Sequence, residues 1–154
     1  MSKQMDKYKL SLAGEYRVCS ELLRRGLLAS VVVGNQKSTD IHIVTSDGRV
    51  IVIEVKTTTS NKFLTKFFQK FETENKGHPD FWVLCRLNEG GDEFFILSHR
   101  EMAIAQAKRN GLQDDFIWEE AYETFRKGVD SVLKQHVACH IDSWNKIVEA
   151  VTVN

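Results

Sequence analysis

The sequence predicts an α/β protein in which a central mixed β-sheet is flanked by helices, with extra helices at the carboxy-terminal end. Two patterns support this prediction. Apolar residues recur at helical spacing over 7–25, and an apolar, β-branched run at 50–56 is typical of a buried strand. The predicted elements follow the order helix, three strands, helix, two strands and helices, which is typical of a mixed sheet with helices on its faces.

The first helix is predicted from about Lys7 to Arg25, because Gly26 is an expected helix stop. At 100° per residue its apolar side chains form one arc, made of Leu12, Tyr16, Cys19, Leu22 and Leu23. Glu15 falls inside this arc. A carboxylate on the buried side of a helix requires a partner, unless it lies at the margin and its stem carries it to solvent.

The remaining elements follow from strand, turn and cap signals. Strands are expected over 27–33, 40–45, 49–56, 81–87 and 93–97. A second helix is expected over 62–75, with an apolar face and, on its other side, a lysine stripe formed by Lys62, Lys66 and Lys70. Ser98 caps the next helix, with Glu101 three residues later in a capping-box pattern. From residue 114 on, two helical pieces are expected, the last over 141–151.

Length and composition indicate one domain. The chain has 154 residues, of which 42% are apolar, so we expect a single domain over 1–154, with a core at about 8–110 and a helical extension at about 114–151. No apolar run approaches the length of a membrane span, and the amino terminus lacks the apolar segment of a signal peptide. Three scattered cysteines fit reduced core thiols. We therefore expect a cytoplasmic protein with no membrane partner.

Charge is balanced overall but unevenly distributed. The net charge is zero, which argues against a protein that simply coats nucleic acid. Residues 1–70 hold 12 Lys and Arg against 6 Asp and Glu, whereas residues 71–154 hold 9 against 15. This segregation would favour a positive face for phosphates if it persists in space.

Two charged residues end the buried strand at 49–56. Glu54 and Lys56 are two residues apart, so they share a face. Charges are rarely buried unless they are paired or coordinate an ion. The simpler interpretation is a strand that ends at a wet edge, and the alternative is a functional site.

The strands at 40–45 and 49–56 form a hairpin, and its register decides between a wet strand end and a functional site. A three-residue loop ending in a left-handed Gly48 sets Asp40 opposite Glu54 on one face, where the two carboxylates would repel unless a cation bridged them. A tighter Asp47-Gly48 turn would instead pair Asp40 with Val55 and put the carboxylates on opposite faces. The sequence leaves both turns open.

In the first register the residues form a candidate metal site. Asp40 and Glu54 offer the oxygen ligands that Mg²⁺ prefers, and the Val55 backbone carbonyl adds a further ligand. Lys56, on the same face, would orient a water or offset charge in the transition state. Glu15 would hold a second metal or a metal-bound water. The expected cofactor is Mg²⁺, with Mn²⁺ as a substitute.

Three motifs follow one another along the chain: Glu15, Thr39-Asp40-Ile41 and Glu54-Val55-Lys56. Together they resemble the PD-(D/E)XK superfamily of restriction-endonuclease-like nucleases, and most of all the archaeal Holliday junction resolvases. The resemblance covers residues 10–98 and departs from the pattern at Thr39, where the name-giving proline would stand.

This resemblance implies a restriction-endonuclease-like core and a Mg²⁺-dependent endodeoxyribonuclease. By position, Glu15 matches the helical glutamate, Asp40 and Glu54 the metal ligands, and Lys56 the catalytic lysine. Gln69 matches a glutamine that many members carry on the helix after that lysine.

We therefore expect a DNA endonuclease whose recognition depends on DNA structure or on a larger system, acting as a homodimer or as a component of that system. The alternative is a catalytically silent nuclease-fold protein that serves as a DNA-binding accessory or immunity-type factor. The expected DNA-contacting residues are Lys37, Thr57, Lys62, Lys66 and Lys70. The lysine stripe has a plainer interpretation as a solvated helix face.

Two histidine-containing features are interpreted as structural. His42 shares the face of Asp40 and is expected to be hydrogen-bonded at the rim rather than to bind metal. His136, Cys139 and His140 have helical spacing, but no fourth ligand is evident for a zinc site.

Overall fold

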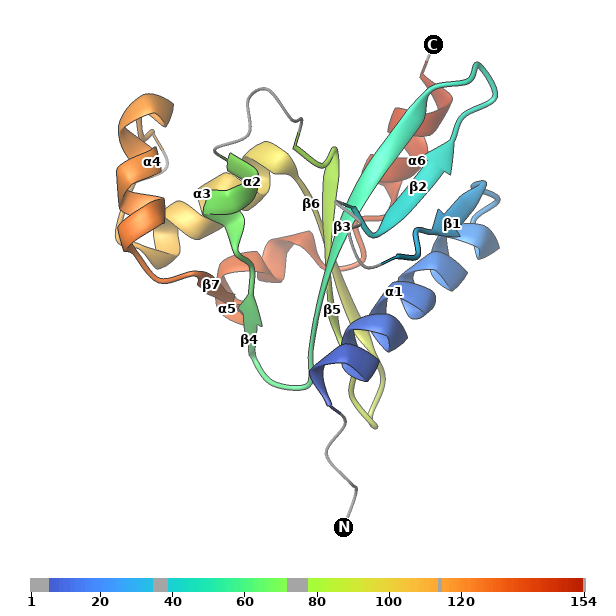
Figure 1. The fold of residues 1–154 in the computed structure, drawn as a ribbon, viewed down its shortest axis with the longest axis horizontal. Helices are drawn as coiled ribbons and strands as arrows, with labels where there is room; N and C mark the ends of the chain where they lie inside the picture. The colour runs from blue at the N-terminus through green and yellow to red at the C-terminus, as the bar shows by residue number, and fades with distance from the viewer. Residues whose placement is uncertain (1–5, 35–38, 72–77, 114, 154) are drawn as a thin grey trace.

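A computed structural model of the protein describes residues 6–34, 39–71, 78–113 and 115–153 (Figure 1). Its strands are β1 (Ala29–Val31), β2 (Ile41–Val44), β3 (Val50–Thr58), β4 (Lys62–Leu64), β5 (Phe81–Arg86), β6 (Glu93–Ser98) and β7 (Ser131–Leu133). Its helices are α1 (Lys7–Arg24), α2 (Phe67–Phe71), α3 (His99–Arg109), α4 (Trp118–Lys127), α5 (Lys134–Val137), the 3₁₀ turn η1 (Ala138–His140) and α6 (Asn145–Thr152).

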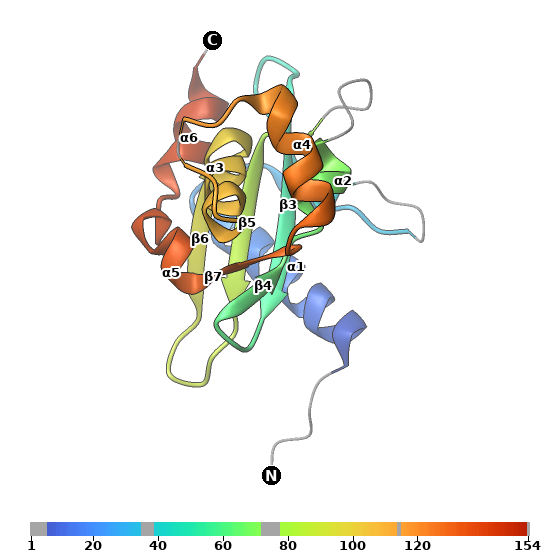
Figure 2. The same cartoon turned by 90° about the vertical axis from the view of Figure 1, so that its left-hand side faces the viewer.

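The main sheet is mixed, as predicted. Within the described ranges it has five strands in the order β1-β2-β3-β5-β6, of which β3 and β5 are parallel and the other neighbours antiparallel. Helices α1 and α6 cover one face, and α2, α3 and α4 lie on the other (Figures 1 and 2). The predicted fold class, a central mixed sheet flanked by helices with extra carboxy-terminal helices, is confirmed.

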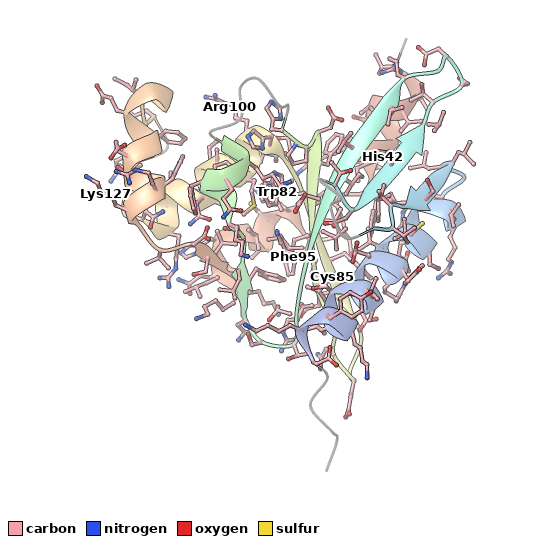
Figure 3. The ribbon with its side chains drawn as sticks, in the orientation of Figure 1. His42, Trp82, Cys85, Phe95, Arg100 and Lys127 are labelled. Atoms are coloured by element: carbon pink, nitrogen blue, oxygen red, sulfur yellow. The ribbon has the colours of Figure 1, made fainter. Side chains whose placement is uncertain are left out.

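Each face of the sheet carries its own hydrophobic core, because side chains alternate between faces along a strand. Cys85 of β5 points to the core beneath α1, whereas Trp82 and Phe95 point to the core beneath α2, α3 and α4 (Figure 3). All three side chains are fully buried. The sheet is therefore fixed by packing on both sides, which makes it a rigid support for side chains at its rim.

Helix α1 begins and ends as the sequence predicts, but its buried face is rotated. Asp6 accepts a hydrogen bond from the Lys9 amide as the amino-terminal cap, and Gly26, with φ of +83°, follows the last turn. The predicted arc is wrong at two positions, since Tyr16 and Leu23 are 56% and 50% exposed. The buried side chains of this helix are those of Glu15, Val18, Cys19 and Leu22, together with the Gly14 backbone. Glu15 thus lies well inside the buried face.

The β2–β3 hairpin adopts the three-residue loop. Ile41 pairs with Ile53, and Gly48 has φ of +84°, as a left-handed loop residue requires. The same register places Asp40 opposite Glu54. The tighter-turn alternative is therefore excluded.

The predicted helix over 62–75 is wrong at its start. Residues 62–64 form β4, which pairs antiparallel with β7, and within the described residues the helix covers only Phe67–Phe71. Side chains at 63, 65 and 67 are buried and those at 62, 64 and 66 exposed, which is the alternation of a strand. The lysine stripe is consequently divided among β4, the 65–66 connection and α2.

β4 and β7 form a second, two-stranded sheet. The carboxy-terminal third is therefore not wholly helical, contrary to expectation, because β7 lies within it. Buried Gln106 of α3 links the segments that hold β4 and β7. Its side-chain amide donates to the carbonyls of Val129 and Ser131 at 2.7 and 3.0 Å, and its carbonyl accepts from the Thr65 hydroxyl at 2.7 Å. These bonds satisfy polar groups that would otherwise be buried without partners.

The capping box predicted for α3 is confirmed, with Ser98 and Glu101 bonded reciprocally. Within the described ranges, no helix is both long enough and apolar enough to span a membrane.

Candidate active site

A large cleft opens along β3 on the side of the predicted site residues. Its floor is formed by residues 54–60, and its volume is about 1350 Å³. The cleft is also lined by the amino-terminal half of α1, by residues 32–34, by Lys62, Leu64 and Lys66, and by residues 87–89 and 92 of the β5–β6 turn. In Figure 1, α1 and β4 lie on opposite sides of β3. Glu15, Asp40, Glu54 and Lys56 all line this cleft.

Asp40 stands at the point where the β2–β3 ladder becomes irregular. Its carboxylate Oδ2 accepts a hydrogen bond of 2.8 Å from the Val55 amide, and its own amide donates to the Ile53 carbonyl at 3.3 Å. A side chain therefore takes the acceptor position that a backbone carbonyl would fill in a regular antiparallel ladder. This exchange fixes the Asp40 carboxylate beside the backbone of Glu54 and Val55.

Glu54 is buried between two lysines. Only 6% of the residue is exposed, its Oε1 lies 3.2 Å from Lys56 Nζ, and its Oε2 lies 3.5 Å from Lys70 Nζ. Lys56 comes from the same strand and Lys70 from α2. Both lysine side chains remain partly exposed, and Lys56 lines the cleft.

The surroundings disfavour the charged form of Glu54. Burial raises the pKa of this carboxyl, the nearby charge of Asp40 raises it further, and Lys56 and Lys70 lower it in part. A buried carboxylate with a second one beside it is an environment in which a bound cation would favour the charged form, in addition to the two lysines.

One atom of Glu54 supports the same conclusion. Among the described residues, Glu54 Oε2 is buried and receives no hydrogen bond, since the Lys70 contact at 3.5 Å is an ion pair without hydrogen-bond geometry. A carboxylate oxygen in this state is a suitable ligand for Mg²⁺ or Mn²⁺. No three His, Cys, Asp or Glu side chains in the described part of the chain form a metal-holding group. Asp40 and Glu54 would therefore supply two carboxylate ligands to an ion, and water and substrate would have to complete its shell.

Glu15 reaches the cleft because α1 lies unusually close to β3. A Cβ built on Gly14 would lie 2.8 Å from Thr57 Cβ, and closer still to Thr57 Oγ1. Only glycine allows this approach. The contact sets the depth of Glu15 relative to Glu54 and Lys56.

An ion-pair network holds α1 against the end of the sheet. Arg17 Nε lies 3.1 Å from Asp92 Oδ2, and Arg17 Nη1 lies 2.6 Å from Glu21 Oε1. Glu21 also pairs with Arg25 at 2.7 Å, and these hydrogen bonds lower the pKa of the Glu21 carboxyl. Because Asp92 belongs to the β5–β6 turn, the network fixes the helix relative to the floor of the cleft.

Several other predicted residues occupy different places. Gln69 is exposed on α2 and does not line the cleft. Thr57, Lys62 and Lys66 do line it. Lys70, predicted as a phosphate contact, lies instead against Glu54, and Lys37 is outside the described residues.

The histidines of both features have hydrogen-bond or ion-pair partners within the protein. His42 Nε2 lies 2.8 Å from Thr39 Oγ1, and the ring lies on β2 (Figure 3). His140 Nδ1 lies 3.1 Å from Glu101 Oε2 and 2.9 Å from Lys146 Nζ, and His136 Nδ1 accepts from the Leu133 amide. Burial and the charge of Lys146 lower the pKa of His140.

The fold is shared with a nuclease. The chain is similar in structure to the bacterial homing endonuclease I-Ssp6803I, with a TM-score of 0.57 at 10% sequence identity, over 96% of this chain and 95% of that one. No protein-family model matches the chain, and no curated protein matches it in sequence. At this identity the likeness describes the fold, which is consistent with a restriction-endonuclease-like core, and the roles of individual residues rest on the geometry of the cleft.

Sequence reasoning missed the contributions of Lys70 and Gly14. Lys70 reaches Glu54 only because α2 follows a strand that pairs with distant β7, and no local pattern encodes that pairing. Gly14 carried a usable signal, since glycine within a helix costs about 1 kcal/mol relative to alanine and therefore indicates a packing reason.

Proposed function

We propose that this chain is a metal-dependent DNA endonuclease of the PD-(D/E)XK type. The observation that carries the proposal is the arrangement of Asp40, Glu54 and Lys56 in one cleft, with Glu15 on its wall, on a fold that a homing endonuclease also has. Two carboxylates and a lysine at a cleft are the groups that metal-assisted phosphodiester hydrolysis requires.

In this proposal Asp40, Glu54 and the Val55 backbone carbonyl would hold Mg²⁺ or Mn²⁺. The ion would supply Lewis acidity for the phosphate and for a water nucleophile. Glu15 would hold a second ion or orient a water at the site. The hydrogen bond from the Val55 amide keeps Asp40 in position before any ion arrives.

Lys56 has the catalytic role among the cations. Its ammonium, held by Glu54 at 3.2 Å, would turn to the phosphate and offset the negative charge on the phosphoryl oxygens of the transition state. The oxygen of one water adds to phosphorus and one P–O ester bond breaks. A phosphate monoester and a hydroxyl end result, the water proton passing to solvent and the leaving oxygen gaining one. Lys70 would hold Glu54 in place while Lys56 is engaged.

The rest of the cleft would hold the backbone of DNA. Lys62 and Lys66 offer positive charge and Thr57 a hydroxyl, groups that contact phosphates without reading bases. Recognition would then depend on DNA structure, on a second copy of the chain or on a larger system.

The test is cleavage of supercoiled and linear plasmid by the pure protein with Mg²⁺, Mn²⁺ or EDTA. Nicked and linear products from the supercoiled form, formed with either metal and absent in EDTA, are the expected result. Tight DNA binding without cleavage in either metal would contradict the proposal and favour a silent DNA-binding protein on the same fold.

A second prediction concerns the DNA path. Replacing Lys62 and Lys66 together with alanine should weaken binding across unrelated sequences and reduce the slope of log K against log salt, by roughly 0.9 for each lost contact with duplex phosphate. Both residues are exposed, so the melting temperature should change little. The exposed lysines Lys108 and Lys127, outside the cleft, provide the matched double variant, and equal slopes for the two variants would move the DNA path elsewhere.

A further inference from the structure

The cleft carries exposed apolar side chains that hydrolysis does not use. Tyr8, Val33 and Leu64 line it and are 73%, 74% and 57% exposed. In the described part of the chain, Val33 and Tyr8 are the two most exposed of the large apolar side chains. Single exposed apolar residues are common on protein surfaces. Three of them line the same cleft, so they are available to contact a ligand that enters it.

These side chains come from different elements around one floor. Tyr8 belongs to the first turn of α1 and Leu64 to β4, the elements on either side of β3 (Figure 1). Val33 follows β1. A polynucleotide that runs along β3 toward Glu54 would therefore have apolar groups on both sides.

Cations accompany the apolar groups. Lys7 precedes Tyr8, and Lys62 and Lys66 flank Leu64, and all three lysines are exposed and line the same cleft. Cations bind phosphates, and aromatic rings stack on the faces of bases with little regard to sequence. In a duplex, stacked neighbours cover these faces, so only unpaired nucleotides present them.

We infer that the cleft binds DNA with unpaired nucleotides, such as single strands or the single-stranded parts of branched molecules. Tyr8 stacks on a base, Leu64 contacts an adjacent one, and Lys7, Lys62 and Lys66 hold the phosphates. This inference rests on the proposed function, since it takes DNA as the ligand, and it adds the class of DNA structure.

Fluorescence anisotropy in EDTA tests it without cleavage, with a labelled oligothymidylate, the same oligonucleotide with abasic sites, and a duplex of equal length. Tyr8→Ala should weaken binding of the oligothymidylate by about fivefold or more, because one base–aromatic stack is worth about 1–3 kcal/mol. The abasic strand should lose no affinity on this substitution, and Tyr8→Phe should bind like the wild type. Tyr16→Ala is the matched control, because Tyr16 is exposed on the same helix and does not line the cleft.

Equal losses for Tyr8→Ala and Tyr16→Ala, the same loss on the abasic strand, or tighter binding of duplex than of single strand would each overturn the inference. Cleavage is measured separately with Mg²⁺. A wild type that cleaves DNA but shows no dependence on Tyr8 overturns this inference and keeps the proposed function. A wild type that shows the Tyr8-dependent binding but does not cleave DNA keeps this inference and overturns the proposed function.

Discussion

Asp40→Asn and Glu54→Gln should each reduce DNA cleavage by about three orders of magnitude or more, because a metal ion supplies several kcal/mol to the transition state and each 1.36 kcal/mol is a factor of ten. Both substitutions keep the size of the side chain and remove the charge that would hold the ion. Binding of DNA in EDTA should persist or tighten, since a negative charge near phosphates is lost. Gel-based initial rates and anisotropy on the same preparations measure the two effects.

Glu54→Gln should also affect stability, in a direction that the pKa of Glu54 sets. Because the folded state raises this pKa above its ordinary value, Glu54 favours folding at pH below the ordinary glutamate pKa, and that contribution is lost as pH rises through the raised pKa. At pH 7 the buried carboxylate is therefore a cost. The glutamine variant should melt at or above the wild-type temperature at pH 7, and the difference should shrink near pH 4, where the wild-type carboxyl is protonated.

Metal should reverse this stability difference. A bound cation stabilises the carboxylate form, so Mg²⁺ or Mn²⁺ should raise the melting temperature of the wild type and leave that of either variant unchanged. Glu149→Gln, an exposed carboxylate on α6, is the matched control. Wild-type cleavage rates in Asp40→Asn/Glu54→Gln would assign the activity to another site or to a contaminant.

The parts of the fold that depend on neighbouring residues could be predicted from the sequence. The capping box at Ser98, the glycine stop of α1 and the strand at 50–56 are all local signals, and the structure has each of them. The position of Asp40 opposite Glu54 could be predicted in part, because the loop of a hairpin fixes its register. The sequence allowed two loop lengths, and the pairing of Ile41 with Ile53 shows which one forms.

The parts that depend on distant residues could not be predicted. Residues 62–64 have the apolar spacing of a helix start, yet they form β4 because β7, far along the chain, offers backbone partners and Gln106 satisfies Thr65. Tertiary pairing then overrides local propensity. The same pairing sets where α2 begins, and so it decides that Lys70, rather than Gln69, lies beside Glu54.

Gly14→Ala should impair both stability and cleavage, although alanine is the better helix former by about 1 kcal/mol. A Cβ at this position would lie 2.8 Å from Thr57 Cβ, an atom fixed to the backbone of β3, so the helix or the strand must move. Overpacking of this kind costs about 1–3 kcal/mol, and in a domain of this size each kcal/mol lowers the melting temperature by about 2–4 °C. The steric term therefore outweighs the helix propensity.

The larger effect of Gly14→Ala should fall on catalysis. Moving α1 away from β3 carries Glu15 away from Glu54 and Lys56, and a displacement of about 1 Å can cost about 100-fold in rate. Adding Thr57→Ala removes Thr57 Oγ1 and Cγ2 and should restore part of the stability, giving a non-additive pair. Ser20→Ala, on the exposed face of the same helix, should instead stabilise slightly and leave the rate unchanged. A Gly14→Ala protein that melts higher than the wild type and cleaves at its rate would show that α1 does not set the depth of Glu15.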